Sequence, residues 1–319
     1  MKDIRVVFMG TPSFAVPILE GLIENYNVVM VVCQPDRKKN RKGDIIKPDT
    51  KVLAEKYNIP VFQPFKIREE YDTILEIMPD IIITCAYGQI IPEVILNCPK
   101  YGCINVHGSL LPKLRGGAPI HWAIINGEKE TGITVMKMAK RMDAGDIISQ
   151  RSIRIDDDMI LDELYGMMSY LGRDLLLDTM PSIIDGTCTY IKQNEEEVTF
   201  GYNISKEDEK LDFNMDIVSF RNKVRGLNSV PGAYLYMDNL RIKVYEVDVV
   251  NSDKYSDSEL GSIVEVTGDS IVVRGSNGLI YIKDIAIEGK KRCRVKDYFN
   301  GIDKKSLVGK VLKWKRIKW

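Results

Sequence analysis

Short apolar runs alternate with amphipathic stretches through the first 180 residues of the chain. The apolar runs have the length of buried strands and cover residues 4–9, 28–33, 81–85, 103–106 and 134–138. Helical spacing is found between them, at residues 14–25, 50–57, 69–78 and 119–126. Strands that alternate with helices are typical of an open α/β sheet, so we expect a mostly parallel, Rossmann-like sheet. A further amphipathic helix at 161–180 is expected to pack on it.

The pattern changes near residue 193. Charged residues interrupt the apolar spacing between 193 and 214, which predicts a linker there. A helical stretch at 215–225 follows, and then come short strand-like runs at 241–250, 261–266, 270–274 and 279–285. We therefore predict two domains. Residues 1–204 form the α/β domain, and residues 205–319 form a smaller, mostly β domain, a barrel or a sandwich.

The composition is that of an ordinary globular protein, with 45% hydrophobic and 28% charged residues. No run approaches the ~20 apolar residues of a membrane span. The first apolar run is too short, and too soon followed by Gly10-Thr11-Pro12, to be a signal peptide. These features predict a cytoplasmic protein. We interpret Gly10-Thr11-Pro12 as a strand-to-helix turn, because it lacks the spaced glycines of a dinucleotide-binding loop.

Cysteine and histidine usage argues against a metal site. The six cysteines include no Cys-x-x-Cys pair and the chain has two histidines, so we expect reduced thiols and no metal. Lysine plus arginine equals aspartate plus glutamate, at 45 each, yet the charge is unevenly distributed. Residues 290–319 hold twelve basic and two acidic side chains. Such a segment suits contact with the phosphates of a nucleic acid.

Three polar residues stand out as candidates for chemistry. Asn105 and His107 are two positions apart at the end of a predicted strand, so their side chains point to the same side. Asp143 follows the next predicted strand, and we expect the two strand ends to face one crevice. An amide, an imidazole and a carboxylate suit the attack of an amine on a carbonyl. The first two stabilise the oxyanion, and the carboxylate orients the imidazole and takes part in proton transfer.

Two stretches around these residues carry a resemblance to a known family. CINVHGSLLPKLRGGAPI at 103–120 and MDAGD at 142–146 resemble the active-site segments of the 10-formyltetrahydrofolate-dependent formyltransferases. Similar stretches are GTPSFA at 10–15, QPDR at 34–37, AYGQIIP at 86–92 and GLNSVPGA at 226–233. The resemblance implies that Asn105, His107 and Asp143 are catalytic. It also implies that residues 86–92 border the pterin ring of the folate, which is bound by Ser109, Leu110, Leu111 and Pro112.

The resemblance further implies a reaction and a partner. A formyl group would pass from 10-formyltetrahydrofolate, a consumed co-substrate, to the α-amine of methionine on initiator tRNA, without a metal. The C-terminal domain would be an oligonucleotide-binding (OB)-like barrel that binds the tRNA. The basic loop at 37–43 would contact the acceptor arm through Arg41 and Lys42. We expect a monomer.

Three other interpretations remain open from the residues alone. An enzyme that formylates the amine of a sugar nucleotide would share the three candidate residues, but would not need the basic loop or the basic C-terminal domain. A hydrolase would pass the formyl group to water. An RNA-binding module with a vestigial α/β domain would lose no activity when His107 is replaced.

Overall fold

The computed structural model describes residues 3–38 and 45–315, which form two compact units. The first unit comprises Met1–Pro119, Glu130–Arg154 and Leu164–Tyr202, and the second comprises Ile120–Lys129, Ile155–Glu163 and Asn203–Trp319. Two short segments from the first half of the chain thus cluster with the C-terminal residues. The domain ranges 1–204 and 205–319 stay a prediction.

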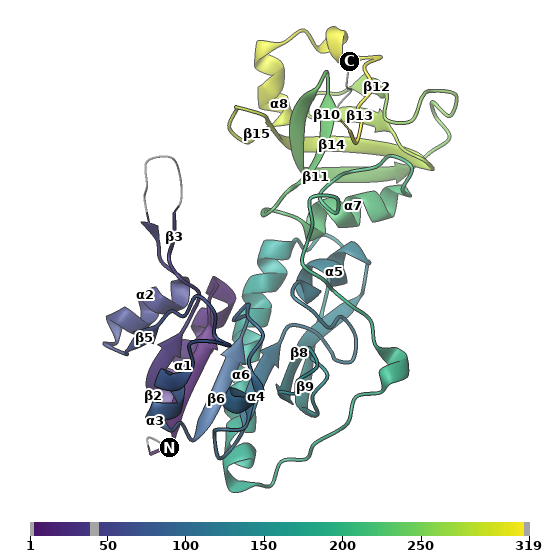
Figure 1. Cartoon of the computed structure of the whole chain (residues 1–319). Coiled ribbons are helices and arrows are strands. Elements are labelled where there is room, and N and C mark those ends of the chain that lie inside the picture. The colour runs from purple at the N-terminus through teal and green to yellow at the C-terminus, as the bar shows by residue number, and fades with distance from the viewer. Residues whose placement is uncertain (1–2, 39–44, 316–319) are drawn as a thin grey trace. The chain divides into compact units, whose positions relative to one another are not determined.

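A seven-stranded sheet forms the centre of the first unit, in the order β5-β2-β1-β6-β7-β8-β9 (Figure 1). Its strands are β1 (Arg5–Gly10), β2 (Asn27–Val32), β5 (Val61–Phe62), β6 (Ile81–Cys85), β7 (Cys103–His107), β8 (Glu130–Lys137) and β9 (Ile147–Arg154). Neighbours from β5 to β7 are parallel, which confirms the mostly parallel sheet. β8 runs antiparallel to β7, and β9 antiparallel to β8. The short β3 (Arg37–Lys38) and β4 (Ile45–Ile46) pair separately.

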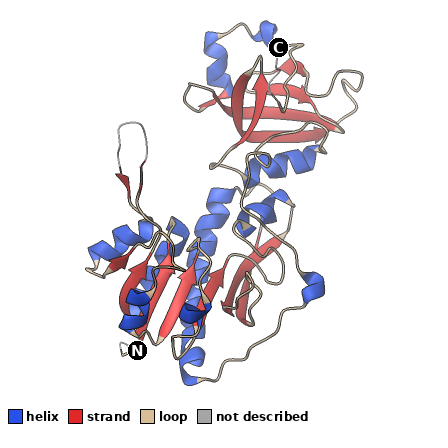
Figure 2. Ribbon diagram, in the orientation of Figure 1, coloured by secondary structure: helices blue, strands red, loops and turns tan. Residues whose placement is uncertain are grey.

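Helices cover both faces of this sheet (Figure 2). On one face, α1 (Val16–Asn25) lies against α6 (Leu161–Asp185), where Gly21 meets Arg173. On the other, α3 (Asp72–Ile77) and α4 (Glu93–Leu96) bury Ile74 and Ile95 against β1. Because both faces are covered, the inner strands β1, β2 and β6 are almost continuously apolar instead of alternating. The remaining helix of this region, α2 (Asp49–Lys56), contacts α1.

The second unit is built on an antiparallel sheet of order β10-β11-β14-β13-β12, with β15 beside β14. Its strands are β10 (Ala233–Met237), β11 (Leu240–Asn251), β12 (Ile263–Val266), β13 (Ile271–Arg274), β14 (Gly278–Ile287) and β15 (Cys293–Arg294). Phe220 of α7 (Ile217–Gly226) is fully buried in the core of this unit. The four strands predicted here are confirmed, while β10 and β15 were not predicted. Two further helices are α5 (Pro119–Ile125) and α8 (Val295–Tyr298).

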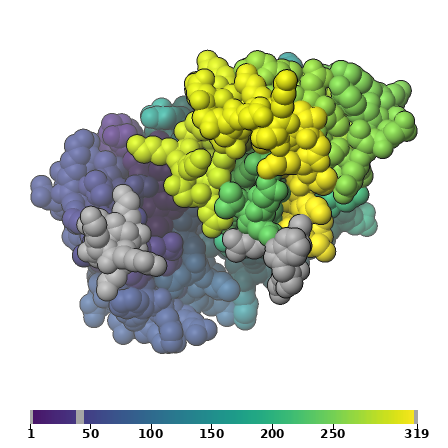
Figure 3. Space-filling model, turned by 90° about the horizontal axis from the view of Figure 1, so that it is seen from above, coloured from purple at the N-terminus to yellow at the C-terminus, as the bar shows by residue number. Residues whose placement is uncertain are grey.

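Residues 311–313 close this sheet into a barrel. Lys313 exchanges two backbone hydrogen bonds with Tyr236 of β10, and Val311 pairs with Ser262 beside β12. β10 and β12 are the two edges of the sheet, so one short segment covers both rows of unpaired backbone groups. Leu307 and Leu312 enter the core. The basic C-terminal stretch, coloured yellow over the surface of this unit in Figure 3, is therefore partly a structural element.

We expect the closure of the barrel to depend on Leu312, whose side chain is 4% exposed. Replacing it with alanine removes buried methyl groups and leaves a cavity, so Leu312→Ala should lower the free energy of unfolding by about 2–5 kcal/mol. Denaturant unfolding followed by tryptophan fluorescence measures the change. The matched control is Val308→Ala, because Val308 is 50% exposed and its truncation should stay within about 0.5 kcal/mol. Equal effects of the two substitutions would contradict the closure.

Candidate active site

Asn105 lies in β7 beside Thr84 of β6, its register partner. The Thr84 hydroxyl donates to Oδ1 of Asn105 at 2.8 Å. Because Oδ1 is held as an acceptor, the amide NH₂ of Asn105 is left on the opposite side as a donor. Thr84 is only 2% exposed and was missed by the sequence analysis. Its signal was a hydroxyl inside the otherwise apolar run at 81–85.

His107, at the end of β7, is buried between a carbonyl and a carboxylate. Its Nε2 lies 3.1 Å from the carbonyl oxygen of Leu114. A carbonyl only accepts hydrogen bonds, so Nε2 carries the hydrogen in this arrangement. Nδ1 lies 3.8 Å from Oδ1 of Asp143, the distance of a loose ion pair. Both ring nitrogens therefore face groups of the protein.

Asp143 reaches His107 by a route that the strand pattern does not predict. In the register of β7 and β8, Thr134 lies beside His107 and Lys137 lies beside Ile104. β8 therefore ends three residues from His107 along β7, roughly 10 Å away. The expectation that the two strand ends face one crevice is wrong, because β8 runs in the opposite direction. The loop at 138–146, which we call the Asp143 loop, returns along β7 to bring the carboxylate to the imidazole.

The Asp143 loop has little room to vary. Asp143 adopts a left-handed backbone conformation with φ of 49°. A Cβ on Gly145 would lie 1.7 Å from the carbonyl oxygen of Lys137, so only glycine fits there. The backbone N–H of Gly116 donates to Oδ2 of Asp143 at 2.8 Å. One carboxylate oxygen is thus held by the backbone, and the other faces His107.

The four candidate folate-binding residues form a turn directly after β7. The Ser109 hydroxyl donates to the carbonyl oxygen of Lys113 at 2.6 Å, and Leu111 is buried. The side chain of Ser109 and the backbone of Leu111 fix the turn itself, since Leu111 also bonds to Thr134 and Gln150. Leu110 and Pro112 are half-buried and lie at the accessible edge.

A third segment, residues 193–202, runs beside the loop that carries Arg115, and we call it the strap. Arg115 N–H donates to the carbonyl of Thr199 at 2.9 Å, and Gly201 N–H donates back to the carbonyl of Arg115 at 2.8 Å. Ala118 N–H donates to the carbonyl of Gly201 at 2.9 Å. The first part of the predicted linker is therefore hydrogen-bonded to the loop that follows His107.

Arg41 and Lys42, the predicted tRNA contacts, lie outside the residues that the structure describes. Within them, no group of three or more His, Cys, Asp or Glu side chains has the arrangement of a metal site, and all six cysteines are unbridged. No helix in the described part of the chain is long and apolar enough to span a membrane.

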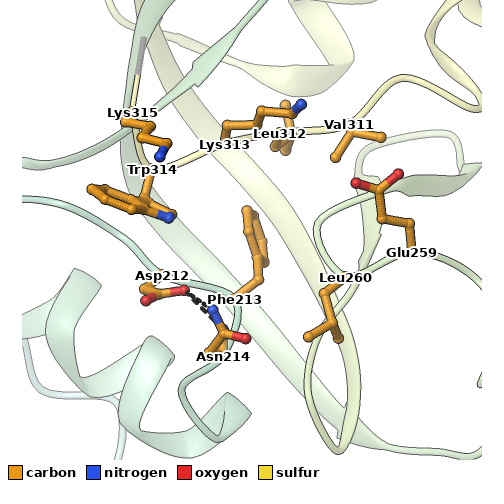
Figure 4. A pocket seen from close by; sticks show the side chains of 10 residues that line it. All are labelled: Asp212, Phe213, Asn214, Glu259, Leu260, Val311, Leu312, Lys313, Trp314 and Lys315. Carbon is orange, nitrogen blue, oxygen red and sulfur yellow. Dashed lines mark hydrogen bonds between the residues drawn. The ribbon is translucent and has the colours of Figure 1, made fainter. Parts of the chain in front are cut away.

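One hollow of about 200 Å³ lies in the second unit (Figure 4). Phe213, Leu260 and Trp314 line it, and it contains none of the candidate catalytic residues. Trp314 is 40% exposed, with the ammonium groups of Lys210 and Lys315 at 5.7 Å and 5.0 Å from its ring centre. The candidate active site is thus defined by its hydrogen bonds and not by this hollow.

Comparison with protein families gives the class of this chain. Residues 4–180 match the formyl transferase family, and residues 203–303 match the formyl transferase C-terminal domain. The first match alone covers more than half of the chain. The chain therefore belongs to the formyl transferase family.

A curated relative narrows the class. The methionyl-tRNA formyltransferase of Staphylococcus epidermidis is 46% identical over 311 residues, which cover 97% of this chain and 99% of the relative. At this identity over nearly the full length of both chains, the present chain belongs to the methionyl-tRNA formyltransferase branch of the family.

Solved structures share the fold at low sequence identity. An N-formyltransferase from Helicobacter canadensis, in complex with folinic acid and dTDP-3-aminofucose, aligns with a TM-score of 0.66 and 19% identity. It covers 88% of this chain and 98% of its own. A methionyl-tRNA formyltransferase from Clostridium thermocellum aligns with a TM-score of 0.55 and 18% identity, over 78% of this chain and 95% of its own.

Thr84 offers a test of how Asn105 is held. Thr84→Val keeps the shape of the side chain but removes the hydroxyl, so the Asn105 amide loses the donor that orients it. We expect kcat for formyl transfer to fall about tenfold, as for the loss of one hydrogen bond that positions a reacting group. Thr84→Ser retains the hydroxyl and should stay near the wild-type rate. If valine and serine give the same kcat, Thr84 does not orient Asn105.

Proposed function

We propose that this protein transfers the formyl group of 10-formyltetrahydrofolate to the α-amine of methionine on initiator tRNA, giving N-formylmethionyl-tRNA for translation initiation. One observation carries the proposal. Asn105, His107 and Asp143 are arranged as a donor, an imidazole and a carboxylate, in a chain 46% identical to a methionyl-tRNA formyltransferase.

In the proposed reaction, Asn105 and His107 stabilise the oxyanion. The amine nitrogen attacks the formyl carbon, the new C–N bond forms, and the carbonyl oxygen gains negative charge. The Asn105 NH₂ group donates to this oxygen. The Nε2–H of His107, which now bonds to the carbonyl of Leu114, is the second donor. Binding of the formyl group therefore exchanges the carbonyl of Leu114 for the substrate oxygen.

Asp143 takes part in moving the proton. The attacking amine loses one proton, and the folate nitrogen gains one when its bond to the formyl carbon breaks. Oδ1 of Asp143 lies 3.8 Å from Nδ1 of His107, so the carboxylate faces the imidazole ring. Because Oδ2 is held by Gly116, Oδ1 is the oxygen to which we assign proton exchange with the reacting groups. The reaction balances without a metal or a covalent intermediate.

The folate-binding role of Ser109, Leu110, Leu111 and Pro112 belongs to the same proposal. Their turn begins at Ser109, two residues after His107, so a ligand along its accessible edge brings its reactive end to β7. The complex of the Helicobacter canadensis protein with folinic acid, a folate, supports a folate ligand in a protein of this fold.

The second unit is proposed to bind the tRNA, together with Arg41 and Lys42. Two sets of its basic side chains differ in their partners. Arg292, Arg294 and Lys310 form ion pairs with carboxylates of the barrel. Lys290, Lys291 and Lys305 form no ion pair with any described residue. The second group is free to meet phosphates, and we assign it the larger part of the electrostatic attraction.

Removing the imidazole separates catalysis from tRNA binding. His107→Ala should abolish formyl transfer while most of the affinity for Met-tRNA remains, because the proposed phosphate contacts lie elsewhere. Formylation kinetics and a filter-binding titration on the same variant measure both. Undiminished transfer would overturn the mechanism.

A comparison of acceptors tests the proposed function on the wild-type protein. The protein is offered Met-tRNA, uncharged tRNA, a sugar-nucleotide amine and water. Preference for the sugar amine or for water would overturn the proposed function.

The two groups of cations predict different salt effects. Lys290→Ala/Lys291→Ala should weaken tRNA binding and reduce the slope of log K against log salt by about one for each phosphate that the variant no longer neutralises. Arg41→Ala should act in the same direction. Lys254→Ala is the matched control, because the ammonium of Lys254 is paired with Glu265 at 2.9 Å. An unchanged slope in the Lys290/Lys291 variant would contradict the assignment of these lysines.

A further inference from the structure

The side-chain amide of Gln193, the first residue of the strap, joins two loops of the candidate active site. Its Oε1 accepts from Nε and Nη2 of Arg115, at 3.0 Å and 2.8 Å. Its Nε2 donates to the carbonyl oxygens of Asp143 and Gly145, at 2.7 Å and 2.8 Å. One amide thus ties the loop that follows His107 to the Asp143 loop.

This amide has no unused bonding capacity. A primary amide offers two N–H donors and two acceptor positions on oxygen, and all four are used here. Its orientation is also unambiguous, since a guanidinium only donates and a carbonyl only accepts. Neither a carboxylate nor an apolar side chain of the same length can serve both partners.

A second link runs parallel to the first. Glu195 of the strap accepts from Nη2 of Arg115 at 3.0 Å and from Nη2 of Arg141 at 2.9 Å, and these hydrogen bonds hold the pKa of its carboxyl below the usual value. Arg115 is 1% exposed, and its guanidinium pairs with the carboxylate of Glu195 in the strap at 3.0 Å. Arg141 belongs to the Asp143 loop, two residues before Asp143.

The Asp143 loop needs such a link. The direction of β8 leaves the loop to cover about 10 Å along β7 before it reaches His107. Asp143 then adopts a left-handed conformation, which persists only where the surroundings over-determine it. The two bonds from Gln193 hold the carbonyls on either side of Ala144, next to the strained residue.

We propose that Gln193 is a positioning residue for formyl transfer, which sets the Asp143 carboxylate against His107 by fixing the backbone of the Asp143 loop to the buried Arg115. This inference rests on the proposed function, because it acts through Asp143. It assigns a role in catalysis to a residue of the predicted linker.

Two substitutions separate positioning from simple stability. Gln193→Glu retains an acceptor for Arg115 but turns a carboxylate oxygen toward the carbonyls of Asp143 and Gly145. Gln193→Met removes both sets of bonds. We expect kcat to fall about 100-fold in both variants, as for a displacement of about 1 Å in a reacting group. The thermal midpoint should fall in Gln193→Met and stay close to wild type in Gln193→Glu. The exposed neighbour Glu196, as Glu196→Gln, is the control and should keep the wild-type kcat.

The outcomes are distinct. Wild-type kcat in folded Gln193→Glu, or a kcat that follows the thermal midpoint across both variants, would overturn the positioning role. Asp143→Asn is measured alone and with Gln193→Met. If Gln193 acts through Asp143, the double variant is no slower than Asp143→Asn, whereas independent roles multiply. If Asp143→Asn alone keeps the wild-type rate, the proposed mechanism fails, whatever Gln193 does.

Discussion

The direction of β8 is the constraint on which the candidate active site depends. A parallel strand beside β7 would end near His107, whereas β8 ends beside Ile104 and leaves its loop to make up the distance. The site is therefore assembled by hydrogen bonds between loops and not by strand ends alone. Gly116, Gln193 and the tight packing of Gly145 together supply that assembly.

These hydrogen bonds matter because some of them also satisfy a buried charge, the guanidinium of Arg115. The Arg115 guanidinium is among the largest fully buried side chains, and an uncompensated charge there would be very unfavourable. Its partners are the residues that reach the Asp143 loop, so the need to satisfy a buried cation and the placement of the carboxylate are met by the same contacts. A substitution here changes stability together with geometry unless, like Gln193→Glu, it retains an acceptor for the Arg115 guanidinium.

Much of the fold could be predicted from the sequence, because it follows from local pattern. Continuous apolar runs predicted β1, β2, β6, β7 and β8, and helical spacing predicted α6. β9 was missed because its exposed polar positions, IISQRSIR, interrupt the apolar signal. Asn105 and His107 were found as neighbours on one strand, while Thr84 and Gln193 were not, since their roles arise from contacts 21 and 50 residues away in sequence. The catalytic, folate-binding and tRNA-binding roles stay predictions.

The closure of the barrel by residues 311–313 also orders events during synthesis. Until that segment has left the ribosome, β10 and β12 present open edges, and Leu312 is missing from the core. The residues of the first unit, by contrast, have all been synthesised once Tyr202 has been added. The nascent chain thus passes through a stage in which the α/β unit is complete in sequence and the barrel is not, and in which exposed strand edges invite pairing with other chains.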